Sequence, residues 1–509
     1  MNTYQNQRSR PIIIGAGIAG LSVALRLAVK GLKPIVFEKE AEVGGKAHQV
    51  HIHHESNDYL INGGPTVLTM LSVFEELYQI AGTNIHEHLS IHPMRALARH
   101  FWSDQSTLDL YTDLDQSFEA IHQFAGSNEA KNFLGFHTYT QKIYDSVKDI
   151  FIDAPKPSVK DFAAYLKPSI LPKLYRADVH RSMWSAIDQY FDDPRLKQLF
   201  GRYATYTGNN PFMTPATFNL ISAVEQSGVW VVDGGLSKLA KSLEELILQH
   251  GGQVHKDLGI DKIIVHDKQV QGVRLSDGIQ LNSAQVVFNG DCQALFRGQL
   301  ISGDFAKKPV ITYPKSERSL SALTACGIVR KNKAKLLYHN VYFSDNYESE
   351  FRELESGKYP TDPTIYFCAQ DRREDLKVKD SELPYERIFA LVNAPARGDE
   401  LSFDDAGASL CQKRIETIMN SLQLANFTAS TWTRPNDWNQ RFPYSGGAIY
   451  GQGVKKWNGN LKRMGAKSKI KGLYLVGGTV HPGAGVPMAA LSGKWATEAM
   501  MKDCLSTVS

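Results

Sequence analysis

The stretch from Pro11 to Lys46 constrains the fold of this chain more than any other part of its sequence. It opens with an apolar β-branched run, Ile12 to Ile14, which is typical of a parallel strand buried on both faces. Three glycines follow in the spacing G-x-G-x-x-G, namely Gly15, Gly17 and Gly20. In this pattern the first glycine allows a tight turn, the second lets a pyrophosphate approach the backbone, and the third lets the next helix lie close to the strand. The stretch therefore predicts a strand, a turn and a helix that bind a dinucleotide.

A second strand and an acidic residue complete this unit. Apolar residues at helical spacing follow the glycines, Gly31 stands where that helix should end, and Pro34 to Phe37 form the next apolar run. Glu38 lies 18 positions after Gly20, where a carboxylate binds the ribose hydroxyls of an adenine nucleotide. The free N–H groups at the start of the helix favour a phosphate there. A signal peptide is the rival interpretation, and phased glycines followed by a second strand argue against it.

A glycine pair and a cation, Gly44-Gly45-Lys46, distinguish FAD from NAD. They resemble the G-G-(Arg or Lys) element of two-domain flavoproteins in which FAD lies extended. Lysine in place of the more usual arginine replaces a planar fork by a point charge. Because no histidine or cysteine stands in an evident flavin-linking context, we expect noncovalent FAD.

Composition sets the broad class of the protein. The 509 residues are 42% hydrophobic and 22% charged, which is ordinary for a globular protein and long enough for about three domains. A net charge of +4 is too small to indicate nucleic acid and suits an anionic membrane surface. Five scattered cysteines read as reduced thiols. We therefore expect a cytoplasmic protein that associates peripherally with a membrane.

Four histidines between positions 48 and 54 invite a metal-site interpretation. Alternation along a strand explains two of them, and no cysteine or acidic partner stands at ligand spacing, so no metal site is predicted. The longest apolar run, from 472 to 493, is interrupted by a histidine and two prolines. It reads as strand, turn and helix rather than as a membrane span.

The fold class expected is α/β, with an FAD-binding domain interleaved with a substrate domain. Residues 1–95, 236–300 and 466–509 are assigned to a Rossmann-like FAD-binding domain because they carry the apolar strand runs and glycine turns. Residues 96–235 show longer helical patterns rich in aromatics and are assigned to a helical, membrane-facing region. Residues 301–465 carry strand-like runs and are assigned to the sheet of an α+β substrate domain.

The segment from Phe162 to Arg181 mixes apolar anchors with cations. This composition is typical of a segment that lies in a membrane interface, although an ordinary amphipathic helix on a core remains equally open. The cations expected to attract anionic lipid are Lys167, Lys173, Arg176 and Arg181.

Two further glycine turns stand where backbone N–H groups can face a ligand. Gly64-Pro65-Thr66 precedes a helical pattern, which makes it either a plain helix-initiating turn or a ligand-binding one. Near the end of the chain, residues 483–487 lead from a strand into a helix. The N-terminus of that helix would stabilise negative charge on the pyrimidine side of a reduced flavin.

Six motifs occur along the chain in this order: GAGIAG, GGK, GGPTVLT, YTGNNPF, GVWVVDGG and HPGAGVPMAALSG. With them the chain resembles the phytoene-desaturase family of FAD-dependent carotenoid desaturases. The versions GGPTVLTM, RYATYTGNNPF and GGAIYG are most similar to those of hydroxycarotenoid 3,4-desaturases. The residues expected to bind FAD are Gly15, Ala16, Gly17, Ile18, Ala19, Gly20, Glu38, Lys39, Gly44, Gly45, Lys46, Gly64, Pro65, Thr66, Val254, Gly478, Val486, Pro487 and Met488.

The resemblance implies a reaction in which two hydrogens leave adjacent carbons of an acyclic carotenoid and a hydride passes to flavin N5. It favours a 1-hydroxylated substrate and 3,4-desaturation. Trp230 is a candidate wall of the substrate tunnel and His481 a candidate near the reacting carbons, with a purely structural role equally open for each. So lipophilic a substrate should enter from a membrane. A phytoene-type desaturase, an amine or protoporphyrinogen oxidase of the same fold, and a flavin-less lipid-binding relative remain alternatives, and the final electron acceptor, oxygen or a quinone, stays open.

Overall fold

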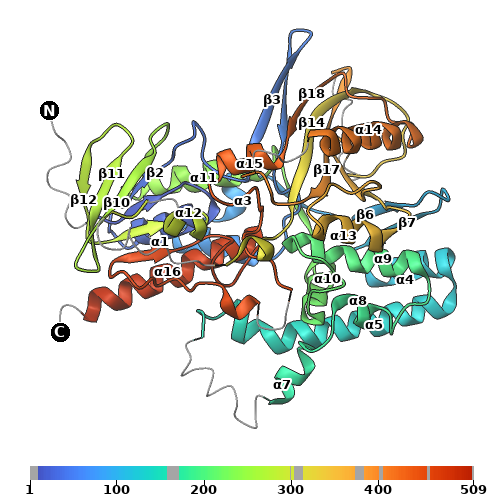
Figure 1. Ribbon diagram of the computed structural model, residues 1–509, viewed down its shortest axis with the longest axis horizontal. Coiled ribbons are helices and arrows are strands. Elements are labelled where there is room, and N and C mark those ends of the chain that lie inside the picture. Colours follow the sequence, from blue (N-terminus) through green and yellow to red (C-terminus); the bar gives the residue numbers. More distant parts are fainter. Residues whose placement is uncertain are drawn as a thin grey trace.

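The computed structural model describes residues 10–157, 171–297, 300–302, 313–372, 383–400, 405–455 and 459–506. These residues form two lobes (Figure 1). One lobe holds both described ends of the chain, and the other holds a large mixed sheet with a group of helices beneath it in this view. The candidate site lies where the two lobes meet.

The first lobe is built on a five-stranded parallel sheet, as the sequence predicts. Its strands run in the order β19 (Leu473–Leu475), β13 (Val286–Phe288), β1 (Ile12–Ile14), β2 (Ile35–Phe37) and β9 (Gln253–His255). They come from the three ranges assigned to the FAD-binding domain. Helices pack on the sheet through a common apolar core, and these are α1 (Ile18–Val29), α2 (Ser72–Ile80), α11 (Leu236–Gln249) and α16 (Val486–Ser506).

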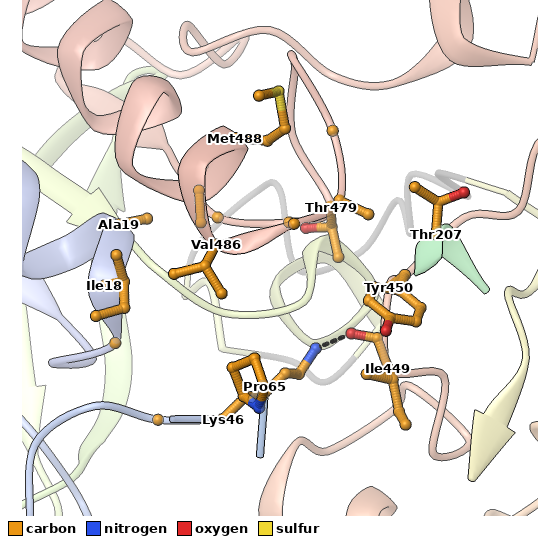
Figure 2. A pocket seen from close by; sticks show the side chains of 18 of the residues that line it. Ile18, Ala19, Lys46, Pro65, Thr207, Ile449, Tyr450, Thr479, Val486 and Met488 are labelled. Atoms are coloured by element: carbon orange, nitrogen blue, oxygen red, sulfur yellow. Dashed lines mark hydrogen bonds between the residues drawn. The ribbon is translucent and has the colours of Figure 1, made fainter. Parts of the chain in front are cut away.

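The first and last of these helices are in close contact. The Ser22 hydroxyl donates a hydrogen bond to the carbonyl of Ala490 at 2.9 Å. A Cβ atom on Gly493 would lie only 2.7 Å from the Ser22 oxygen, so glycine is required at this crossing. The contact brings the N-termini of α1 and α16 to the same edge of the parallel sheet, where both face the cavity (Figure 2).

A small antiparallel sheet covers the outer side of the first lobe. It consists of β10 (Ile260–His266), β11 (Gln269–Leu275) and β12 (Gln280–Asn282), which alternate buried and exposed side chains. Within the range 236–300, therefore, only β9 and β13 join the parallel sheet. The small α12 (Cys292–Arg297) follows β13.

The second lobe is organised around a seven-stranded mixed sheet. Its order is β18 (Ala429–Thr433), β14 (Ser321–Arg330), β17 (Tyr385–Ala394), β16 (Ile365–Ala369), β15 (His339–Tyr342), β6 (Ala96–Phe101) and β7 (Thr107–Tyr111). Only the β15–β6 pair is parallel. The remaining helices near this sheet are α13 (Tyr347–Glu355), α14 (Asp405–Ser421) and α15 (Pro435–Arg441).

The range 96–235, for which the sequence predicts helices, also supplies strands. Beyond β6 and β7, it contributes β8 (Trp230–Val232), which pairs with β5 (Ile91–Pro93). The hairpin of β3 (Gln49–His54) and β4 (Asn57–Asn62), earlier in the chain, is a separate two-stranded sheet that packs against β14 and β17. The helical elements of the range 96–235 are α4 (Leu114–Ala125), α5 (Ser127–Val147), η1 (Lys148–Ile152), α7 (Leu171–Arg176), α8 (Met183–Ile187), α9 (Pro194–Gly201), η2 (Arg202–Thr207), η3 (Ala216–Asn219) and α10 (Leu220–Gln226).

Aromatic packing holds these helices together. The ring of Phe200 lies 4.8 Å from the rings of both Phe136 and Phe191, which joins α9 to α5. Within the part of the chain that the structure describes, no helix combines the length and the apolarity needed to cross a bilayer.

Candidate functional site

One continuous cavity of about 1060 Å³ joins the two lobes. At one end it is lined by the turns that follow β1, β2, β13 and β19, and at the other by η2, α10 and the inner face of the seven-stranded sheet. All nineteen residues predicted to bind FAD line it except Ala16, Gly20 and Val254. The sequence motifs, which are far apart along the chain, thus meet in a single site.

The glycine turn after β1 has no room for side chains. Gly15 adopts φ of +94°, and a Cβ atom on it would lie 2.8 Å from the carbonyl oxygen of Asn289. A Cβ atom on Gly20 would overlap the carbonyl oxygen of Gly15. Gly20 therefore acts by letting α1 lie against β1, which explains why it does not line the cavity.

Asn289 is a site residue that the sequence analysis missed. Its side-chain amide donates to the carbonyls of Gly15 at 3.1 Å and Gly17 at 3.3 Å, and it thereby fixes the turn from the neighbouring strand β13. Its one sequence signal is its position directly after the apolar run Val286–Phe288, since the ends of adjacent parallel strands share one edge of a sheet.

Glu38 is buried at the end of β2, with 6% of its surface exposed, and it lines the cavity. The N–H of Ala16 donates to one carboxylate oxygen at 2.7 Å, and the N–H of Glu40 donates to the other at 3.0 Å. An ionised carboxylate accepts about four hydrogen bonds, so each oxygen keeps a free lone pair. The carboxylate is thus held in place with capacity left for two ribose hydroxyls.

Lys46 extends across the cavity (Figure 2). Its ammonium group donates to the carbonyl of Ile449 and lies 5.1 Å from the ring of Phe442. Burial lowers the pKa of Lys46 to about 8, and the nearby Asp291 carboxylate acts in the opposite direction. The residue links the two lobes in this structure, and its contact with a phosphate stays a prediction.

The turn at Gly64 and the start of α16 complete the first end of the cavity. A Cβ atom on Gly64 would overlap the carbonyl oxygen of Lys46, so the turn is built for glycine. Val486 and Met488 at the start of α16 line the same cavity as Ile18 and Ala19 of α1, and Figure 2 shows Val486 on the side toward Ile18. Two helix N-termini, tight glycine turns and a buried carboxylate fit an extended dinucleotide such as FAD.

Arg463 is a second residue that the sequence did not reveal. It is buried beside the cavity, and burial lowers its pKa to about 10. Its guanidinium donates to the carbonyls of Gly478 and Gln452, each at 2.6 Å. It therefore holds the turn after β19 against the 449–454 segment, and Gly478 contributes to the site through its backbone, as expected.

Besides Ala16 and Gly20, three predicted residues lie outside the cavity lining. Trp230 pairs with Leu68 through its backbone N–H at 2.8 Å, and its ring packs over Gly228 rather than along the cavity. His481 is buried, and its ring contacts the carbonyl of Ala154 at 2.9 Å, while its neighbour Pro482 lines the cavity. Val254 pairs with Val36 inside the parallel sheet. These positions reflect strand and turn geometry that residue type alone does not indicate.

The second end of the cavity contains buried polar groups among apolar walls. The Tyr366 hydroxyl lies 2.7 Å from the Thr66 hydroxyl and 2.6 Å from the Nδ1 atom of His339. Burial lowers the pKa of His339 to about 3, so this imidazole is neutral. Arg202, Tyr206 and Glu225 also line this end.

Short helix α7 leads directly into the cavity wall. Lys173, Tyr175 and Arg176 are exposed on it, with 79% of the Tyr175 surface accessible, and it projects below the body of the molecule in Figure 1. Ala177 and Val179, which follow α7 immediately, line the cavity.

The other predicted membrane cations differ from these. Arg181 forms an ion pair with Asp178 at 2.7 Å and is therefore already neutralised within the fold. Lys167 belongs to residues 158–170, which lie outside the described residues.

Comparison with known proteins gives three consistent results. Residues 18–501 match the family model described as flavin containing amine oxidoreductase. The chain is 39% identical to the hydroxyneurosporene desaturase of Rubrivivax gelatinosus, over 98% of this chain and 94% of that protein, and 36% identical to that of Rhodobacter capsulatus, over 97% and 98%. Cyclohexylamine oxidase from Brevibacterium oxydans shares the fold, with a TM-score of 0.60 and 13% identity over 98% of this chain and 99% of that one.

Proposed function

Because this chain belongs to the flavin-containing amine oxidoreductase family, we propose that it is an FAD-dependent desaturase of acyclic carotenoids. It removes two hydrogens from adjacent carbons, and its preferred substrate carries a 1-hydroxylated end beside the 3,4 bond that is desaturated. The names of the hydroxyneurosporene desaturases, which match this chain over nearly its full length, support this substrate class.

The observation that carries the proposal is that one cavity contains both an FAD-type cradle and an apolar chamber. When bound, the flavin supplies the acceptor for a hydride. The protein then has to place a carbon chain against it and exclude water, and apolar walls do both. Transfer of each CH₂ group from water into such walls contributes about 0.8 kcal/mol, so a long hydrocarbon is held without any charged anchor along its length.

We propose that FAD is held noncovalently. Among the described residues that line the cavity, none is a histidine or a cysteine, the side chains expected to form a covalent link to flavin. Precipitation with acid should therefore leave the yellow colour in solution. Colour retained in the pellet would contradict this part of the proposal.

The substrate enters, in this proposal, from a membrane surface next to α7. The exposed Lys173, Tyr175 and Arg176 combine cations with an amphipathic ring, and the residues just after them line the cavity. A carotenoid that passes this way never crosses bulk water, which avoids the large hydration cost of its hydrocarbon.

The direct test supplies the purified protein with matched hydroxylated and non-hydroxylated acyclic carotenoids in liposomes, followed by chromatography of the products. We expect dehydrogenation of the hydroxylated compound and much slower reaction of the hydrocarbon. Equal turnover of both, or turnover of phytoene, would overturn the substrate assignment. Turnover of amines or protoporphyrinogen with no reaction of carotenoids would overturn the desaturase assignment itself.

A further inference from the structure

A cation stands in the apolar end of the cavity. Arg202, the first residue of η2, lines the cavity there. Many residues that line the same cavity are apolar, among them Phe218, Leu220, Ile221, Val224, Phe389 and Leu391. A charge in such surroundings is costly unless its hydrogen-bonding groups are satisfied, so its presence requires an explanation.

The protein provides hydrogen-bond acceptors for only some of the donors of this guanidinium. The Nη2 atom of Arg202 donates to the Tyr206 hydroxyl at 3.1 Å, and the guanidinium stacks 4.9 Å from the Tyr206 ring. Within the ranges that the structure describes, this is its one side-chain hydrogen bond, although a guanidinium carries five N–H donors. Donors on Nε and Nη1 therefore remain available toward the cavity.

The hydrogen bonds around Arg202 have a defined direction, because two tyrosines donate to Glu225. The Tyr206 hydroxyl donates to Glu225 at 2.5 Å, and the Tyr203 hydroxyl donates to the other oxygen of the same carboxylate. Burial, reinforced by the Glu225 charge, raises the pKa of both tyrosines well above the ordinary value, which keeps them as donors. Among the described residues no hydrogen bond joins Arg202 to Glu225. Glu225 orients Tyr206, Tyr206 accepts from Arg202, and the Nε and Nη1 donors of Arg202 stay unused.

We propose that Arg202, oriented by Tyr206 and Glu225, binds the terminal oxygen atom of the substrate. This inference rests on the proposed function and names the residues that select a hydroxylated end. An oxygen at the chain end accepts from the free N–H groups, whereas a hydrocarbon end would cover the cation without supplying an acceptor. A site that loses a buried hydrogen bond in this way rejects the analogue far more strongly than a site that reads length alone. Arg202 thus sets both substrate preference and the end that is inserted.

The test compares Arg202→Met with the wild type on matched hydroxylated, methoxylated and hydrocarbon carotenoids in liposomes. We expect kcat/KM for the hydroxylated substrate to fall about 10- to 150-fold, the range for a hydrogen bond to a charged group, while kcat/KM for the hydrocarbon changes less than about threefold or rises. The methyl ether should follow the hydroxylated substrate, because its oxygen also accepts. Arg352→Met, which removes an exposed arginine on α13, is the control.

Two conservative variants keep the test informative if Arg202→Met folds poorly, which its flavin absorbance would reveal. Arg202→Lys retains charge and should keep part of the preference, and Tyr206→Phe should lower it about three- to tenfold by freeing the guanidinium from its bridge to Glu225. Equal loss on all substrates, or an unchanged preference, would overturn the inference alone. A wild-type protein that acts on none of the three would overturn the proposed function and this inference with it.

Discussion

The two ends of the cavity are built in different ways. At the nucleotide end the contacts come from backbone, namely glycine turns, strand ends and two helix N-termini, with Glu38 as the principal side chain. At the substrate end the contacts come from side chains on η2, α10 and β16, such as Arg202, Glu225 and Tyr366. Where contacts come from the backbone, a substitution that alters the backbone shape is hardly tolerated. Where they come from side chains, a single substitution can change which ligand groups are bound. The first end therefore defines the family, and the second end defines the substrate.

The largest effect should come from placing a side chain in the backbone-built end. Gly15→Ala forces a Cβ atom onto a residue at φ of +94° and against the Asn289 carbonyl at 2.8 Å. Backbone strain and overpacking each cost about 1 to 3 kcal/mol, so we expect loss of bound flavin and a much lower Tm. Gly135→Ala, on α5 with 3.5 Å to its nearest neighbour, is the matched control. A normal flavin content in Gly15→Ala would remove the distinction between the two ends.

The next effect concerns the Glu38 carboxylate at the nucleotide end. Glu38→Ala removes hydrogen bonds to a charged group and should weaken FAD binding by about 1.5 to 3 kcal/mol, measured by flavin fluorescence titration. Glu42→Ala, which removes a carboxylate paired with Lys241 on the surface, should leave the affinity unchanged. If Glu38→Ala binds FAD as tightly as the wild type, the ribose lies elsewhere.

A smaller effect is expected at α7, where we propose that the protein meets a membrane. Neutralising Lys173 and Arg176 together, each to Gln, should weaken binding to anionic liposomes by about 1 kcal/mol per charge, and rising salt should shrink the difference. Flavin content should not change. The same charge removal at Arg352 and Lys413, which are exposed on α13 and α14, serves as control. Equal losses from both pairs would place membrane contact on another surface.

The smallest effect is a pH dependence that belongs to Lys46. Its pKa is about 8 in this structure, and a bound pyrophosphate would raise it. Below pH 8 the lysine is already charged and FAD affinity is constant, whereas above pH 8 binding requires uptake of a proton. Affinity should then fall by at most about tenfold per pH unit until the raised pKa is reached. Lys46→Met should abolish this slope, and a slope that persists in the variant would assign it to another group.

The same contrast explains what the sequence could predict. The turn residues from Gly15 to Glu38 were recognised because a strand, a turn and a helix form locally, and the spacing of the glycines reports the backbone. The parallel fold that they imply is confirmed. Val254 and Gly20 belong to elements that form the site, but both pack against the neighbouring backbone and do not line the cavity. Residue type alone does not tell which face of a strand or helix meets a ligand.

The residues of the substrate end could not be predicted from local sequence patterns. Arg202 and Glu225 are 23 positions apart, and Tyr366 meets Thr66 across 300 positions, so their proximity depends on the tertiary fold. Strand β6 joins the mixed sheet through a parallel pair with β15, which lies about 240 residues later. Its side chains are nearly all buried and do not alternate between apolar and polar, so its sequence does not mark it as a strand. Trp230 is a large aromatic residue suited to a tunnel wall. Its backbone pairs with Leu68, however, and its side chain does not line the cavity.

The packing of α16 on α1 has a consequence for the order of events in the cell. The sheet has β19 at its edge, and Gly493 packs against Ser22 of α1, so the nucleotide cradle that begins at Ile12 is unfinished until residues about 480 positions later have been synthesised. During translation the growing chain carries the glycine turn without its closing helix. We therefore expect a chain that is cut short before β19 to retain flavin poorly, because it lacks both the edge strand and the closing helix.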